Sequence, residues 1–155
     1  MTRIEQETTY PDGRPSAKLR MEARDQGMVL RHGDGPDRCD MLGAREALIF
    51  EEHGVYHLFY FTNHIGLDDP NWEYTDAIWV YWSKDLNRWD EKDKAVVLDG
   101  RNCMWSKKCI GMPSVIVVGK RLAIFYDAPG GNSTSHMGRD VGLAWLELPL
   151  SPPKQ

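Results

Sequence analysis

Short runs of alternating apolar and polar residues mark most of the second half of this chain of 155 residues. The clearest pattern pairs an apolar run at 47–50 with VYHLFYFT at 55–62 across a turn ending in Gly54, which predicts a β-hairpin. A second hairpin is predicted from 114–118 and 121–126 around Gly119, with further strands at 28–30, 77–83, 95–98 and 141–148. No twelve-residue window keeps a helical period, so the pattern predicts an all-β fold.

The first part of the chain has a different pattern. Residues 1–27 are polar and are interrupted by Pro11, Gly13 and Pro15, and residues 31–43 are dense in Gly, Asp and Pro. Such composition is typical of an extended or frayed terminus. We therefore expect an N-terminal arm and loop over 1–39 and one β domain over 40–155.

The β domain carries an internal repeat. GAREALIFEEHGVYHLFYF from Gly43 resembles GMPSVIVVGKRLAIFYD from Gly111, with two extra residues assigned to the first turn. DAIWVYWSKDL from Asp76 likewise resembles DVGLAWLELPL from Asp140. A repeat of this length in an all-β chain is typical of β-propeller blades, so we expect two four-stranded blades at about 44–98 and 110–148. The alternative is chance likeness between short β-rich stretches.

Several stretches carry a family resemblance. EALIF at 46–50, HGVYHLFYFT at 53–62, WSKDLNRW at 82–89, MPSVI at 112–116 and LAIFYD at 122–127 resemble the five-bladed β-propeller glycosidases of glycoside hydrolase family 43 and its relatives. The resemblance covers residues 40–148 and implies about half of a propeller. It implies either that copies of the chain assemble into a homodimer or larger oligomer that completes the propeller ring, or that the chain is part of a larger protein. It also implies a carbohydrate partner.

The family's chemistry is hydrolysis of a glycosidic bond by paired acid and base groups, which stand about 6.5–9.5 Å apart in inverting enzymes. By position, the resemblance implies that Glu46 occupies the site of the base, while the second acidic site falls on Ser114. The acid would then come from Asp127, Asp140 or His136, or from another subunit. The alternative is a catalytically silent carbohydrate-binding or assembly module of the same fold.

The sequence also offers residues for holding a sugar. Arg45, Arg139 and Asp40 can bind hydroxyl groups, and Trp72 and Trp105 lie in predicted loops from which indole rings can stack on sugar rings. A structural ion pair is the alternative for Arg45, and a solvated loop is the alternative for the segment that holds Arg139.

Composition excludes several classes. With 19 Lys and Arg against 23 Asp and Glu, the net charge of −4 disfavours nucleic acid. No apolar run reaches about 18 residues, and the N-terminus lacks a signal-peptide core, so we expect a cytoplasmic protein with no membrane partner. Three cysteines without CxxC spacing predict plain thiols. We expect no cofactor and no metal site, with a structural calcium ion as the alternative because the loops are rich in Asp.

Overall fold

The structure is a computed structural model that describes residues 2–6, 19–23, 29–30, 44–65 and 74–152. Chain contacts divide it into two units, residues 1–30 and 31–155. The first contains the antiparallel pair β1 (Thr2–Gln6) and β2 (Leu19–Ala23). These two strands were not predicted, because the segment is polar and strand pairing is made by backbone groups that every residue carries. The predicted strand at 28–30 is wrong for Val29 and Leu30, which lie outside any strand, whereas Met28 is outside the described residues.

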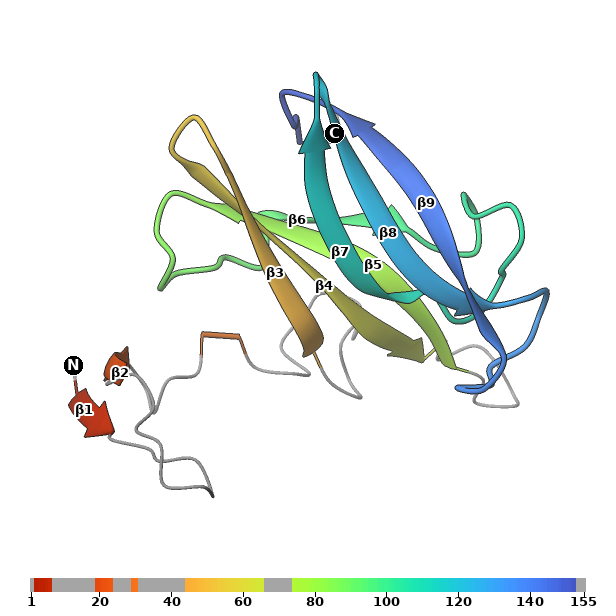
Figure 1. Cartoon of the computed structure of the whole chain (residues 1–155), viewed down its shortest axis with the longest axis horizontal. Coiled ribbons are helices and arrows are strands. Elements are labelled where there is room, and N and C mark those ends of the chain that lie inside the picture. The colour runs from red at the N-terminus through yellow and green to blue at the C-terminus, as the bar shows by residue number, and fades with distance from the viewer. Residues whose placement is uncertain (1, 7–18, 24–28, 31–43, 66–73, 153–155) are drawn as a thin grey trace, which may run out of the picture. The chain divides into compact units, whose positions relative to one another are not determined.

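The second unit contains two open antiparallel sheets (Figure 1). One has four strands in chain order, β3 (Ala44–Glu52), β4 (Val55–Ile65), β5 (Tyr74–Ser83) and β6 (Lys94–Leu98). The other has three, β7 (Gly111–Val118), β8 (Arg121–Pro129) and β9 (Arg139–Glu147). The described residues form no helix, and the all-β prediction is confirmed.

The second sheet has three strands where four were expected. After β9 the chain continues through Pro149 and Pro152, which lie outside any strand. Proline has no N–H group to donate to a strand ladder, so these residues are poorly suited to a further strand.

The internal repeat is a repeat of backbone geometry. The pair Arg45–Phe61 between β3 and β4 recurs 66 positions later as Gly111–Asp127 between β7 and β8, and Glu52–Val55 recurs as Val118–Arg121. Each hairpin has a two-residue turn at one end and a β-bulge at the other. Positive φ at His53, Gly54 and Gly119 suits such tight turns.

This register corrects the sequence alignment of the repeat. Glu46 (φ 52°) corresponds to Met112 (φ 50°) in the bulges, and not to Ser114. In the third strands, Asp76 is opposite Asn63 while Arg139 is opposite Pro129, so Asp76 corresponds to Arg139 and not to Asp140. The repeat in the sequence was aligned by matching apolar residues. In the structure, the turns and bulges of the two hairpins lie 66 positions apart, and they determine which residues correspond.

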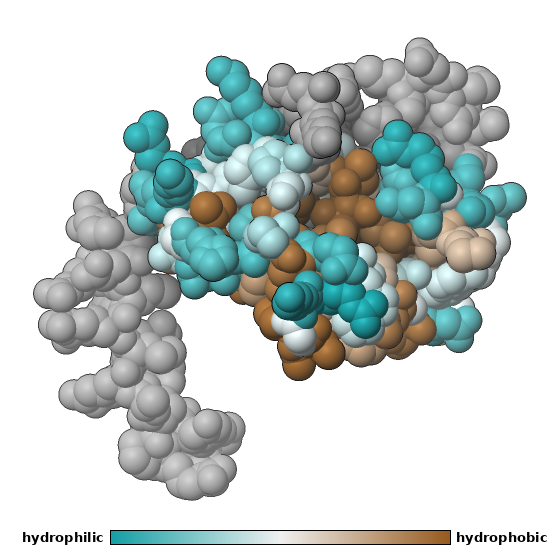
Figure 2. All heavy atoms as spheres, turned by 90° about the horizontal axis from the view of Figure 1, so that it is seen from above, coloured by the Kyte–Doolittle hydropathy of each residue, from teal (hydrophilic) through white to brown (hydrophobic). Residues whose placement is uncertain are grey.

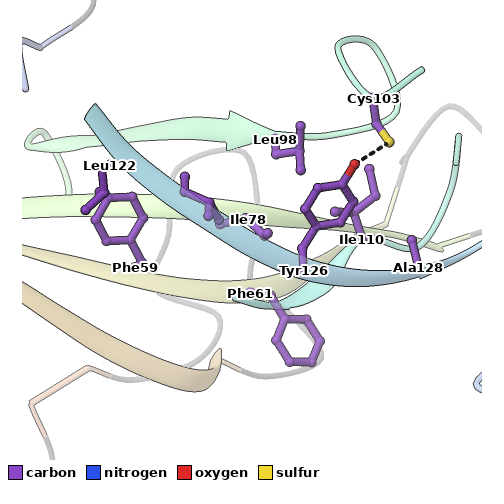
Figure 3. Packing of buried hydrophobic residues seen from close by; sticks show 10 residues of the cluster. Phe59, Phe61, Ile78, Leu98, Cys103, Ile110, Leu122, Tyr126 and Ala128 are labelled. Atoms are coloured by element: carbon purple, nitrogen blue, oxygen red, sulfur yellow. Dashed lines mark hydrogen bonds between the residues drawn. The ribbon is translucent and has the colours of Figure 1, made fainter. Parts of the chain in front are cut away.

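The core lies between the two sheets. Phe59 and Ile78 of the first sheet pack with Leu122 and Ile124 of the second, and all four are fully buried. Ile78 and Ile110 belong to the same cluster as Tyr126, whose hydroxyl oxygen lies 3.5 Å from the Cys103 sulfur (Figure 3). Burying each such large side chain stabilises the fold by about 1.5–3 kcal/mol, which explains why the short strands hold together.

The opposite face of the four-stranded sheet carries an aromatic cluster. The Lys94 ammonium lies 5.3, 4.9 and 4.8 Å from the ring centroids of Tyr60, Trp79 and Tyr81. The Tyr81 ring also meets Trp89 edge-on at 6.4 Å. Trp89, the last residue of the 82–89 segment, thereby has a structural role in packing this segment against β5.

The outer face of the three-stranded sheet is apolar and exposed. Phe125 of β8 lies opposite Leu143 of β9, and Trp145 follows on the same face. These three side chains are 42%, 45% and 39% exposed. Arg121 lies over the Trp145 ring at 4.3 Å, and Glu147 is the residue opposite Arg121 in the strand register, so one end of this face carries both signs of charge.

Candidate functional site

The candidate site lies at one end of the two sheets, where β3, β5 and β9 begin and β8 ends; this end is at the bottom of Figure 1. Because neighbouring strands are antiparallel, residues from the start of one strand and the end of the next meet there. The charged cluster at this end, called the polar end below, comprises Arg45, Glu46, Asp76, Asp127, His136, Arg139 and Asp140.

Arg139 and Asp127 form the best-defined contact of the polar end. The Arg139 Nε and Nη2 atoms donate to the two Asp127 carboxylate oxygens, both at 2.8 Å. Nη2 also donates to the main-chain oxygens of Asp127 at 3.0 Å and Cys109 at 3.3 Å. The hydrogen bonds to Asp127 raise the pKa of Arg139. Asp127 is thus the partner of an ion pair on the middle strand of its sheet, and its carboxylate oxygens are both engaged.

Asp76 is the most buried carboxyl group of the polar end, at 1% exposure. Its burial raises its pKa, against the opposing effects of the Arg45 charge, the Cys109 thiol hydrogen bond and the charges of His136 and Arg139. Its backbone N–H donates to the oxygen of Lys108 at 2.8 Å. Asp76 therefore ties the first sheet to the segment that leads into β7. Sequence reasoning noted Asp76 only as a repeat position, because its burial depends on contacts made far away in the chain.

Cys109 is fully buried against Asp76. Burial, followed by the negative charge of Asp76, raises the pKa of the thiol to about 11. The thiolate is the reactive form of cysteine, so Cys109 is poorly suited to nucleophilic catalysis at neutral pH. Cys103 and Cys109 are both free thiols, as the sequence predicted, and Cys39 lies outside the described residues.

Arg45 and Glu46 are the second and third residues of β3. Glu46 is exposed and occupies the bulge, which directs its side chain away from the regular alternation of the strand. Positive φ is uncommon outside glycine, but Met112 has the same conformation, so the bulge is a property of the hairpin and is not specific to glutamate. The Arg45 guanidinium lies 5.5 Å from the centroid of the Phe61 ring.

The remaining residues that the sequence predicted for the site differ in how exposed they are and in whether the structure describes them. His136 and Asp140 are exposed at the polar end. Trp105 is half-buried: its ring stacks on Tyr126 at 6.0 Å, and its Nε1 donates to the Tyr126 hydroxyl at 3.0 Å. One face of this indole is thus covered by protein. Trp72 and Asp40 lie outside the described residues.

No three His, Cys, Asp or Glu side chains in the described ranges come together as a possible metal site. Within those same ranges, no helix is long and apolar enough to cross a membrane. The chain matches no protein-family model, no curated protein and no solved structure.

Proposed function

We propose that the chain is a propeller-like, glycoside hydrolase-like unit that binds carbohydrate at its polar end. Each sheet is an antiparallel meander, as propeller blades are, and the first two strands of each share one register and one bulge position. These features support reading the two sheets as two blades of a repeated architecture.

One observation carries the carbohydrate assignment. Strands β3, β8 and β9 bring Arg45, Asp127 and Arg139 to one end of the sheets, where exposed Glu46 and Asp140 accompany them. Sugar hydroxyls both donate and accept hydrogen bonds, and charged partners make the stronger hydrogen bonds in proteins. A group of fixed and exposed charges of both signs suits a ligand with many hydroxyl groups.

Hydrolysis is the second candidate function, and the exposure of Glu46 favours it. In this proposal Glu46 is the base, as in the resembling family. Its acid partner is His136 or Asp140, because Arg139 already engages both carboxylate oxygens of Asp127.

We further propose that two copies of this chain associate through the exposed apolar face of the three-stranded sheet. A chain holding about half of a propeller leaves such a face open, and a two-fold arrangement lets the Arg121 and Glu147 end of each copy meet opposite charge on the other. Light scattering is expected to give about twice the chain mass of 17.8 kDa. Leu143→Glu is expected to give monomers, whereas Met104→Glu, at an exposed residue outside this face, leaves the dimer intact. A wild-type monomer contradicts this proposal.

The functional test combines calorimetric binding of oligosaccharides with a screen of aryl arabinosides, xylosides and galactosides. Removing one member of an acid–base pair lowers rate by about 10²–10⁴-fold, so Glu46→Gln should abolish most turnover while binding persists. Glu51→Gln, the same change at an exposed residue near the other end of β3, should leave both unchanged. Binding without turnover in the wild type selects the binding module. Neither binding nor turnover on any sugar would refute the carbohydrate assignment.

A further inference from the structure

The described strands leave β9 as a regular edge of its sheet. The two sheets of the second unit have β3, β6, β7 and β9 at their edges. Of these, β3 and β7 contain a β-bulge and β6 has only five residues. Bulges and short length are common ways in which proteins keep edge strands from pairing with other chains. In contrast, β9, the outer strand of its sheet in Figure 1, has nine residues, no register shift against β8, and neither Lys nor Pro.

One hydrogen bond identifies the backbone groups of β9 that point away from β8. The Leu148 N–H donates to the Lys120 oxygen at 2.9 Å, and these two residues continue the β8–β9 register. Hydrogen-bonded and non-hydrogen-bonded pairs alternate along an antiparallel ladder. The even-numbered residues of β9 therefore bond to β8, while Val141, Leu143 and Trp145 direct their N–H and C=O groups outward. Because β9 pairs with no other described strand, these groups are open to an added strand.

The same three residues carry exposed apolar side chains. Val141 is 75% exposed, and Leu143 and Trp145 are 45% and 39% exposed. They occupy alternate positions and so share one face of the sheet, the outer face to which Phe125 belongs. Figure 2 shows apolar residues gathered at the surface between hydrophilic ones. A strand added to β9 would extend the outer face, so the best partner carries apolar residues at alternate positions as β9 itself does.

We propose that the added strand is β9 of a second copy, paired antiparallel about a two-fold axis at Leu143. This inference rests on the self-association proposed above and specifies its contact. Leu143 then lies opposite Leu143 of the partner subunit, and Val141 lies opposite Trp145 of the partner subunit. At each end, Glu147 lies opposite Arg139 of the partner subunit, a pair of opposite charges. A shift of two residues either way would place Trp145 opposite Arg139 or Val141 opposite Glu147, so the centred register is the one that pairs apolar with apolar throughout.

Disulfide cross-linking between copies tests the pairing. The Cα atoms of a hydrogen-bonded antiparallel pair lie about 5.5 Å apart, within the range of about 4.4–6.8 Å that a disulfide spans, whereas sheets packed face to face lie about 10 Å apart. Cys39→Ser serves as the background, because Cys103 and Cys109 are buried. On oxidation with copper–phenanthroline, Leu143→Cys should shift from 17.8 kDa to twice that mass on a non-reducing gel. Met104→Cys, at an exposed residue outside β9, should stay at the mass of one chain.

A mixing experiment tests the register. Val141→Cys and Trp145→Cys chains should cross-link when mixed but not when oxidised separately, because identical positions would then lie four residues, or about 14 Å, apart along the paired strands. A wild-type monomer in light scattering overturns both this inference and the proposed self-association. A wild-type dimer in which Leu143→Cys or the mixture does not cross-link, or in which Val141→Cys cross-links with itself, overturns the pairing along β9 and leaves the self-association standing.

Discussion

Replacing Gly142 with alanine should disrupt the packing of the second sheet. Gly142 of β9 lies directly opposite Tyr126 of β8, and the tyrosine ring crosses over it. A Cβ atom at position 142 would lie 2.6 Å from the hydroxyl oxygen and 2.7 Å from Cε2, closer than Cβ atoms come to other atoms in proteins. The ring is held by its stacking on Trp105 and by the hydrogen bond from the indole, so it moves only if those contacts are lost.

The expected cost follows from these contacts. Overpacking a tight site costs about 1–3 kcal/mol, and losing the hydrogen bond at Tyr126 adds about 1 kcal/mol. Alanine recovers about 0.5 kcal/mol or more by restricting the unfolded chain. The net loss in the free energy of unfolding should therefore be about 1.5–3.5 kcal/mol. Urea titration followed by tryptophan fluorescence measures it, with a lower midpoint and an unchanged slope.

Two comparisons isolate the cause. Gly130→Ala is the matched control, because Gly130 is exposed and a Cβ there meets nothing within 4 Å. It should change stability by less than about 0.5 kcal/mol. In a Tyr126→Ala background the clash partner is gone, so Gly142→Ala should become nearly neutral. An equal cost with and without the Tyr126 ring would refute the packing argument.

Three further predictions concern polar groups. Arg139→Met should lower the free energy of unfolding by about 2–3 kcal/mol in calorimetry, because Asp127 loses its charged partner in a poorly exposed site; Arg139→Lys should recover only part of it. The folded pKa of His57 lies below its ordinary 6.5, so below that pH the unfolded chain binds more protons than the folded chain. As the pH is lowered below 6.5, the free energy of unfolding of the wild type should therefore fall relative to that of His57→Phe, by up to about 1.4 kcal/mol per pH unit. Urea titrations at a series of pH values measure this, and parallel curves for the two proteins in acid would contradict it. Cys109, with its pKa of about 11, should react with iodoacetamide at least about 100-fold more slowly in the native than in the unfolded protein at about pH 8, as read by mass spectrometry; equal rates would exclude burial.

The strands of the β domain could be predicted because their side chains reveal them. Runs such as 55–62 combine aromatic and β-branched residues and end at turn residues, and β4 occupies this range and extends to Ile65. The register could not be predicted in the same way. Two residues in each bulge face one on the partner strand, and the residue with positive φ is a glutamate in one hairpin and a methionine in the other. Neither residue type signals that conformation.

The candidate site was accessible to sequence reasoning only in part. Charged residues at strand ends, such as Arg139 and Asp127, could be chosen because antiparallel strands bring those ends together. Their mutual pairing could not be foreseen, since either residue alone is compatible with contact to a ligand. Asp76 and His57 were missed as buried polar groups because their surroundings come from segments distant in the chain.

The β3–β4 and β7–β8 hairpins share one backbone geometry but carry different side chains at the bulge. The bulge position holds glutamate in one hairpin and methionine in the other with nearly the same φ, so its backbone conformation does not depend on the side chain. Met112→Glu would therefore place a second exposed carboxylate at the start of the other hairpin without a new backbone conformation. In a repeated fold of this kind, a new active-site group can arise by a single substitution in a position already shaped for it.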